Sequence, residues 1–164
     1  MKTPVRLLAC LLFMVVTEGH AADKLPAASH GVAYPEGWKD WATIAVSHRN
    51  DNNTLRVILG NDVAVQAARA GDTNPWPDGA ILGKVVWKDT QLENWKAAIV
   101  PGEFVHAEFM FKDSKKYTDS YGWGWARWVG LEQKPFAEGM DVCIACHTPV
   151  KNRDWVFTDP ASLP

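Results

Sequence analysis

Cysteine is scarce in this chain, and other features that would assign it to a familiar class are missing. Three cysteines in 164 residues are too few for a disulfide-stabilised miniprotein. Lys and Arg (17) are outnumbered by Asp and Glu (19), so a net charge of −2 leaves no basic excess for nucleic acid. No apolar run reaches the roughly 18 residues of a membrane-spanning helix. A composition that is 47% hydrophobic and 22% charged is that of a globular domain.

The first 22 residues have the pattern of a secretory signal peptide. Lys2 and Arg6 precede the apolar run 7–16, and small residues follow at 19–22. We therefore expect a signal peptide over residues 1–22, export to the periplasm, and a single domain over residues 23–164. Cys10 lies inside the apolar run, which favours ordinary export over lipidation. Removal of the leader leaves two cysteines, three positions apart.

Those two cysteines form the attachment motif of a c-type haem. The sequence Cys143-Ile144-Ala145-Cys146-His147 places both sulfurs on one face of a helical turn. Such sulfurs form thioethers with the two vinyl groups of haem, and the adjacent His147 is the proximal iron ligand. The motif thus predicts one covalently bound haem c per chain.

Other uses of the two cysteines explain the motif less well. A disulfide leaves His147 without a role, and a thioredoxin-like pair needs a βαβ context. Half a zinc site needs further ligands, but His30, His48 and His106 lack metal-ligand spacing.

The distal side of the iron is predicted to be open. Residues 148–164 contain no Met or His, and Met140 is too close to Cys143 to reach the opposite haem face. Met110 is the remaining candidate, and core packing explains it better. A five-coordinate iron favours ligand binding or catalysis over electron transfer alone.

The middle of the chain predicts mainly strands, at 41–46, 54–59, 80–87, 104–111 and 123–129. A turn at 50–53 joins the first two, and residues 95–100 fit either a strand or a short helix. A helix is expected over 62–70, between the N-cap Asn61 and Gly71. The fold class is therefore α+β, a mainly antiparallel sheet with a few short helices, one of which carries the C-terminal haem motif. Several tryptophans on these strands either wall a haem pocket or pack in the core and a dimer interface.

Several segments, taken in order, resemble the cytochrome P-460 family over residues 35–158. They are Pro35-Glu36-Gly37-Trp38 followed by Trp41, Asp78-Gly79 followed by Lys84, Lys112–Tyr117, Gly124-Trp125-Ala126, the motif Cys143–His147, and Val156-Phe157-Thr158. The resemblance implies a periplasmic, homodimeric, antiparallel-β haem protein. Members of this family oxidise hydroxylamine and carry a lysine linked to a haem meso carbon. The related cytochromes c′-beta bind nitric oxide in an apolar pocket and lack the link.

Lys84 falls at the position of the linking lysine. It interrupts the apolar stretch 81–87, where a buried ammonium must be paired, reach solvent or be consumed in a bond. A lysine on an edge strand reaching solvent is the alternative. The resemblance makes Lys84 both a haem-binding and a catalytic candidate.

Glu108 matches a family glutamate in register and is the candidate catalytic base. Strand alternation places Glu108 and Met110 on one face of the strand, and Phe109 and Phe111 on the other. Phenylalanines facing the iron would suit nitric oxide, and Glu108 facing it would suit hydroxylamine. Arg127 either pairs with a haem propionate or stacks on an aromatic surface.

Three functions follow from these observations. The first is a hydroxylamine-oxidising enzyme, which also admits nitric oxide as a substrate and uses a periplasmic electron acceptor. The second is a nitric oxide binding or scavenging protein without turnover. The third is a simple electron carrier.

Overall fold

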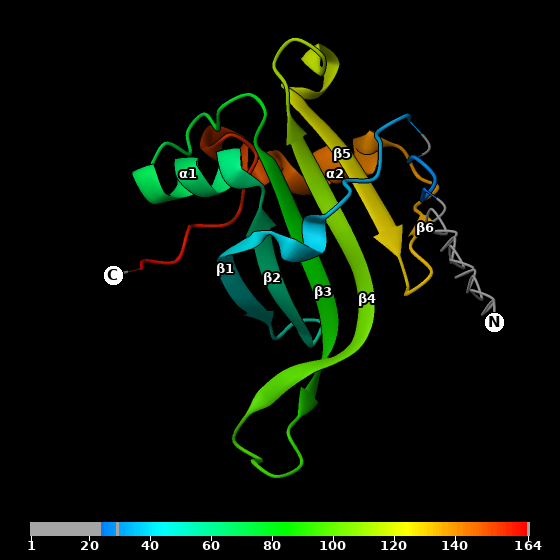
Figure 1. The fold of residues 1–164 in the computed structure, drawn as a ribbon, viewed down its shortest axis with the longest axis vertical. Coiled ribbons are helices and arrows are strands. Elements are labelled where there is room, and N and C mark those ends of the chain that lie inside the picture. Colours follow the sequence, from blue (N-terminus) through cyan, green and yellow to red (C-terminus); the bar gives the residue numbers. More distant parts are fainter. Residues whose placement is uncertain (1–23, 29, 164) are drawn as a thin grey trace, which may run out of the picture.

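The computed structural model describes residues 24–28 and 30–163, and its centre is a six-stranded antiparallel sheet (Figure 1). The strands lie in sequence order, so each pairs with its neighbour in the chain. Two α-helices and three 3-10 helices accompany the sheet in the described residues, which confirms the α+β class. The strands are β1 (Ala42–Arg49), β2 (Thr54–Gly60), β3 (Ile81–Gln91), β4 (Ile99–Lys112), β5 (Trp123–Val129) and β6 (Lys134–Pro135), and the helices are η1 (Trp38–Asp40), α1 (Asp62–Ala70), η2 (Thr118–Ser120), α2 (Met140–His147) and η3 (Thr148–Arg153).

Local sequence signals set the boundaries of the first elements. The turn between β1 and β2 pairs Arg49 with Thr54 and places Asn53 in the left-handed region, which asparagine tolerates. The side chain of Asn61 accepts a hydrogen bond from the Ala64 amide and caps α1. Gly71, at φ 78°, ends the helix. The predicted helix over 62–70 is confirmed.

The hairpin of β3 and β4 is longer than the sequence predicts. Its strands have 11 and 14 residues, and the hairpin extends beyond the other strands (Figure 1). The segment 92–98 forms turns, so the expected strand or helix over 95–100 is wrong except at its last two residues, which begin β4. Trp95 is 65% exposed in this loop, and no local apolar periodicity marks where the pairing ends.

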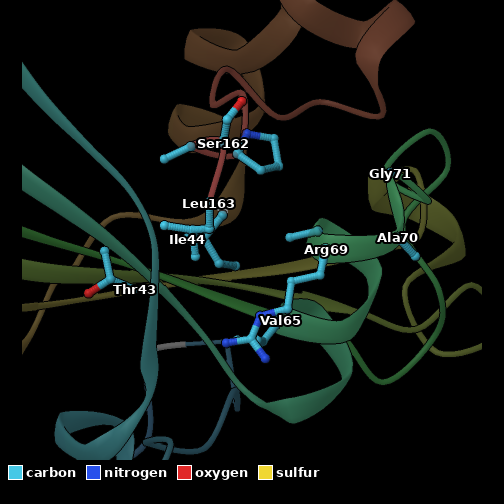
Figure 2. Close-up of a pocket in the computed structure, with 11 residues that line it drawn as sticks. Thr43, Ile44, Val65, Arg69, Ala70, Gly71, Ser162 and Leu163 are labelled. Atoms are coloured by element: carbon cyan, nitrogen blue, oxygen red, sulfur yellow. The ribbon is translucent and has the colours of Figure 1, made fainter.

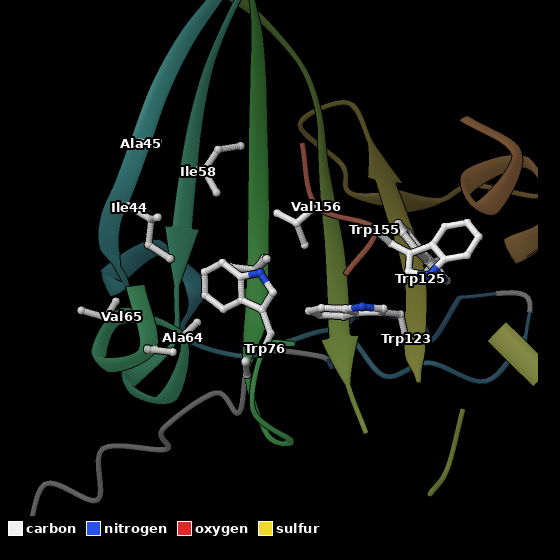
Figure 3. Packing of buried hydrophobic residues seen from close by; sticks show 13 residues of the cluster. Ile44, Ala45, Ile58, Ala64, Val65, Trp76, Trp123, Trp125, Trp155 and Val156 are labelled. Carbon is white, nitrogen blue, oxygen red and sulfur yellow. The ribbon is translucent and has the colours of Figure 1, made fainter. Parts of the chain in front are cut away.

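The two faces of the sheet bury separate apolar clusters. We call the face that carries Lys84, Glu108 and Met110 the helix face, because α1, α2 and the C-terminal segment cover it. Its cluster combines residues of β1, β2, β3 and β5 with Ala64, Val65, Trp76, Trp155 and Val156 (Figure 3). Each large apolar side chain buried there contributes about 1.5–3 kcal/mol.

The opposite face is covered by the segment that precedes β1. We call it the N-terminal face; Val85, Phe109 and Trp128 lie there and pack against Val32 and Trp38. The indole of Trp128 donates a hydrogen bond of 3.0 Å to the carbonyl of Pro26. Phe111 also packs on this face, so the predicted alternation along β4 is confirmed.

Within the described part of the chain, no helix is long and apolar enough to cross a membrane. The predicted signal peptide over residues 1–22, with Cys10, lies outside the described residues.

Candidate functional site

The haem motif lies on α2, against the helix face of the sheet. Cys143 and Cys146 are one helical turn apart, and neither is in a disulfide. Cys143 is half-buried and packs against the helix-face cluster together with Ile144, whereas Cys146 is exposed. Burial raises the pKa of the Cys143 thiol. The helix therefore presents two free thiols at the spacing that haem attachment requires.

His147, the last residue of α2, is oriented by a backbone carbonyl. Its Nδ1 donates a hydrogen bond of 2.7 Å to the carbonyl oxygen of Trp155. Because a carbonyl only accepts, Nδ1 carries the proton and Nε2 presents its lone pair, the tautomer that a metal ligand needs. The ring also packs edge-on against Trp125 and Phe157, with centroids 4.6 and 5.0 Å away. Burial lowers the pKa of His147, which favours the neutral form.

Pairing between strands brings Lys84, Glu108 and Arg127 together on the helix face. Lys84 of β3 is opposite Glu108 of β4, and Glu108 is opposite Arg127 of β5. Both cations form ion pairs with the Glu108 carboxylate, which is 17% exposed. His106, two residues before Glu108, adds a contact of 3.3 Å between Nε2 and Oε1. We call these four residues the charged cluster.

The charged cluster fixes the ionisation of its own members. Burial raises the pKa of Glu108, but the charges of Lys84, His106 and Arg127 outweigh it and lower that pKa to about 2. Burial is the main reason why the pKa of His106 falls to about 4. At neutral pH the cluster therefore holds an ionised carboxylate beside a neutral imidazole.

Three buried nitrogens on the helix face have no hydrogen-bond partner among the residues that the structure describes. They are Nε of Arg56, Nε of Arg127 and Nε1 of Trp125. Buried donors are rarely left without an acceptor, so each of the three is available to donate a hydrogen bond to a water or to a bound cofactor. Two guanidinium groups suit the two carboxylates of haem, which makes this face chemically suitable for that cofactor.

Sequence reasoning found Arg127 but missed Arg56. Arg127 lies 4.4 Å from the centroid of the Phe136 ring, so the stacking alternative is observed, with Phe136 as the aromatic partner. Arg56 interrupts the apolar strand β2 as Lys84 interrupts β3. A charged residue inside an apolar strand was therefore the sequence signal that could have identified Arg56.

Other expected features lie elsewhere or are part of the core. Met110 packs against the helix-face cluster. Trp123, Trp125 and Trp128 are buried. The described residues contain no group of three or more His, Cys, Asp or Glu side chains that could hold a metal ion. A groove of about 820 Å³ lies between α1, β1 and residues 160–163, and Arg69 is the one charged side chain in its lining (Figure 2).

Comparison with known proteins identifies the family of the chain. The family model of cytochrome P-460 matches residues 35–158, which is most of the chain. The chain belongs to the cytochrome P-460 family. As a member of that family it is a cytochrome, with haem as its cofactor and iron as its metal. A search of curated proteins found no match.

Proposed function

We propose that this cytochrome P-460 family member holds haem c through thioethers at Cys143 and Cys146, and that His147 would be a ligand of the iron. The spacing of the two thiols on α2 supports the attachment. The hydrogen bond from His147 to Trp155 supports the ligand role, because it leaves Nε2 free to bind iron. Arg56 and Arg127 are the residues that would pair with the propionates, because each has a guanidinium Nε without a partner in the described part of the chain; for Arg127 this pairing would add to its stacking on Phe136.

We further propose that the protein oxidises hydroxylamine in the periplasm and passes the electrons to a periplasmic acceptor. The observation that carries this proposal is the position of Glu108, on the sheet face against which the haem motif packs. The phenylalanines of β4 lie on the opposite face, away from α2. When bound, haem would supply an iron able to bind the substrate and to take up its electrons. Glu108 supplies an ionised carboxylate that accepts protons.

The charge of Lys84 controls the basicity of the Glu108 carboxylate. A carboxylate whose pKa is about 2 accepts protons poorly at neutral pH, and the Lys84 ammonium is the largest of the charges that lower it. A covalent link from Lys84 Nζ to the cofactor would remove that positive charge. The pKa of Glu108 would then rise, so the cross-link and the proton-accepting role support each other.

The second candidate is a nitric oxide binding protein without turnover. The ion pair between Lys84 and Glu108 favours it, because an ammonium paired with a carboxylate is not a nucleophile and forms no link. In that case Lys84 only neutralises Glu108. Under either function, we also propose that the leader is cleaved, that the protein resides in the periplasm and that it forms a homodimer.

Hydroxylamine-dependent reduction of an artificial electron acceptor by the purified holoprotein tests the function. Loss of a catalytic base costs about 10²–10⁴-fold in rate, so Glu108→Gln should lower kcat by at least about 100-fold. Lys84→Arg keeps the charge but cannot form the same link, and should abolish turnover. The matched control is Lys88→Arg, because Lys88 is an exposed lysine on the same strand. Wild-type protein that binds nitric oxide but shows no turnover would favour the second candidate.

A further inference from the structure

The residues that follow η3 adopt an unusual backbone conformation. Asp154 and Trp155 are consecutive and both have positive φ, at 49° and 66°. Residues other than glycine rarely enter this region, and each does so at a cost that its surroundings must offset. The segment is therefore held in place by its contacts.

The side chain of Asp154 is the centre of those contacts. Lys112 Nζ donates hydrogen bonds of 2.7 and 2.8 Å to its two carboxylate oxygens. The amide of Trp76 donates to the same carboxylate at 2.8 Å, and the indole of Trp123 donates to the backbone carbonyl of Asp154 at 3.0 Å. The Lys112 and Asp154 side chains are only 8% and 10% exposed. This is a buried, hydrogen-bonded ion pair.

The ion pair connects the sheet to the carbonyl that orients His147. Lys112 is the last residue of β4, and Asp154 directly precedes Trp155. The Trp155 ring stacks on Tyr121 with centroids 4.2 Å apart, and its amide donates to the carbonyl of Val150. The Trp155 carbonyl, so fixed, accepts the 2.7 Å hydrogen bond from His147 Nδ1.

We propose that Lys112 and Asp154 are positioning residues that set the strength of the bond that His147 would form with the iron. The inference rests on the proposed function, in which His147 binds the iron. A strong hydrogen bond from Nδ1 makes the imidazole a better electron donor and fixes its ring orientation. The buried pair keeps the acceptor of that bond at hydrogen-bonding distance. A purely structural pair would affect stability and leave the iron–histidine bond unchanged.

The test measures two properties of the holoprotein that a purely structural role would leave unchanged. These are the iron–histidine stretching band in resonance Raman spectra of the ferrous form and the midpoint potential. Asp154→Asn should shift the band to lower frequency and the potential to more positive values, because a weaker Nδ1 hydrogen bond makes His147 a weaker donor. Since Asp154→Asn leaves a buried ammonium unpaired and so endangers folding, the double variant Lys112→Met with Asp154→Asn removes both charges. It should show the same two shifts.

Asp159→Asn is the matched control. Asp159 belongs to the same C-terminal segment and pairs with Arg153, but its side chain is exposed. Its removal should leave both readouts at wild-type values. Lys112→Arg retains a paired cation and should do the same.

A separate variant distinguishes this inference from the proposed function. His147→Ala should abolish the iron–histidine band, and a band that survives it would overturn the ligand assignment and the inference together. If His147→Ala abolishes the band, but Asp154→Asn and the double variant leave band and potential unchanged, the positioning role alone is wrong.

Discussion

Replacing Glu108 by glutamine should destabilise the protein in a way that depends on pH. Glu108 is the one anion of the charged cluster and is 17% exposed, so Glu108→Gln leaves Lys84 and Arg127 close together without a counter-charge. Removing one partner of a buried ion pair costs about 3–5 kcal/mol. We expect a loss of that size in the free energy of unfolding at pH 7.

The pKa of Glu108 sets the pH range of this effect. Its value falls from 4.5 to about 2 on folding, so the carboxylate stabilises the folded state fully above pH 4.5 and loses that contribution as the pH falls towards 2. Each pH unit in that interval is worth about 1.4 kcal/mol, or about 3.5 kcal/mol over the whole range. The wild-type protein should therefore lose stability with acid more steeply than Glu108→Gln, and the difference between the two should become smallest near pH 2.

Urea unfolding followed by circular dichroism between pH 7 and pH 2 measures this difference. Asp51→Asn is the control, because it removes an exposed carboxylate that pairs with Arg49 and should change stability little at any pH. A constant difference between wild type and Glu108→Gln across the range would refute the reasoning.

Two further predictions concern the charged cluster and the core. His106 is neutral when folded and its pKa falls from 6.5 to about 4, so the wild type should lose stability as the pH falls through that interval; His106→Gln should lose less in the same urea titrations. Equal slopes for the two proteins would contradict this. Gly83→Ala places a Cβ 2.8 Å from Cε1 of Phe109, which is buried; thermal unfolding should show a loss of about 1–3 kcal/mol. An unchanged melting temperature would mean that Phe109 can move.

The elements predicted from sequence are those with strong local signals. Alternating apolar residues predict β1 to β5, and the caps Asn61 and Gly71 place both ends of α1. The two-residue strand β6 has no such signal, because Lys134 and Pro135 become a strand only by pairing with β5. The length of the β3–β4 hairpin also depends on pairing between strands.

The candidate site was partly predictable for the same reason. The spacing of Cys143, Cys146 and His147 is local and can be read directly. The contact of Glu108 with Lys84 and Arg127 depends on the register of three strands, which no short motif encodes. Asp154 was missed because its partner Lys112 lies on a different element, 42 positions earlier in the sequence.

Mass spectrometry of the digested holoprotein tests the central claim most directly. If haem is attached through Cys143 and Cys146, on the face that carries Lys84, the digest should contain a haem-bearing peptide with the sequence Cys143–His147. Under the enzymatic proposal, the peptide that contains Lys84 is joined to it through the cofactor. An unmodified Lys84 peptide would show that the cross-link is absent and would not contradict attachment through the two cysteines. Haem that is extracted by acidified organic solvent, with both thiols then free to react with an alkylating reagent, would contradict the account.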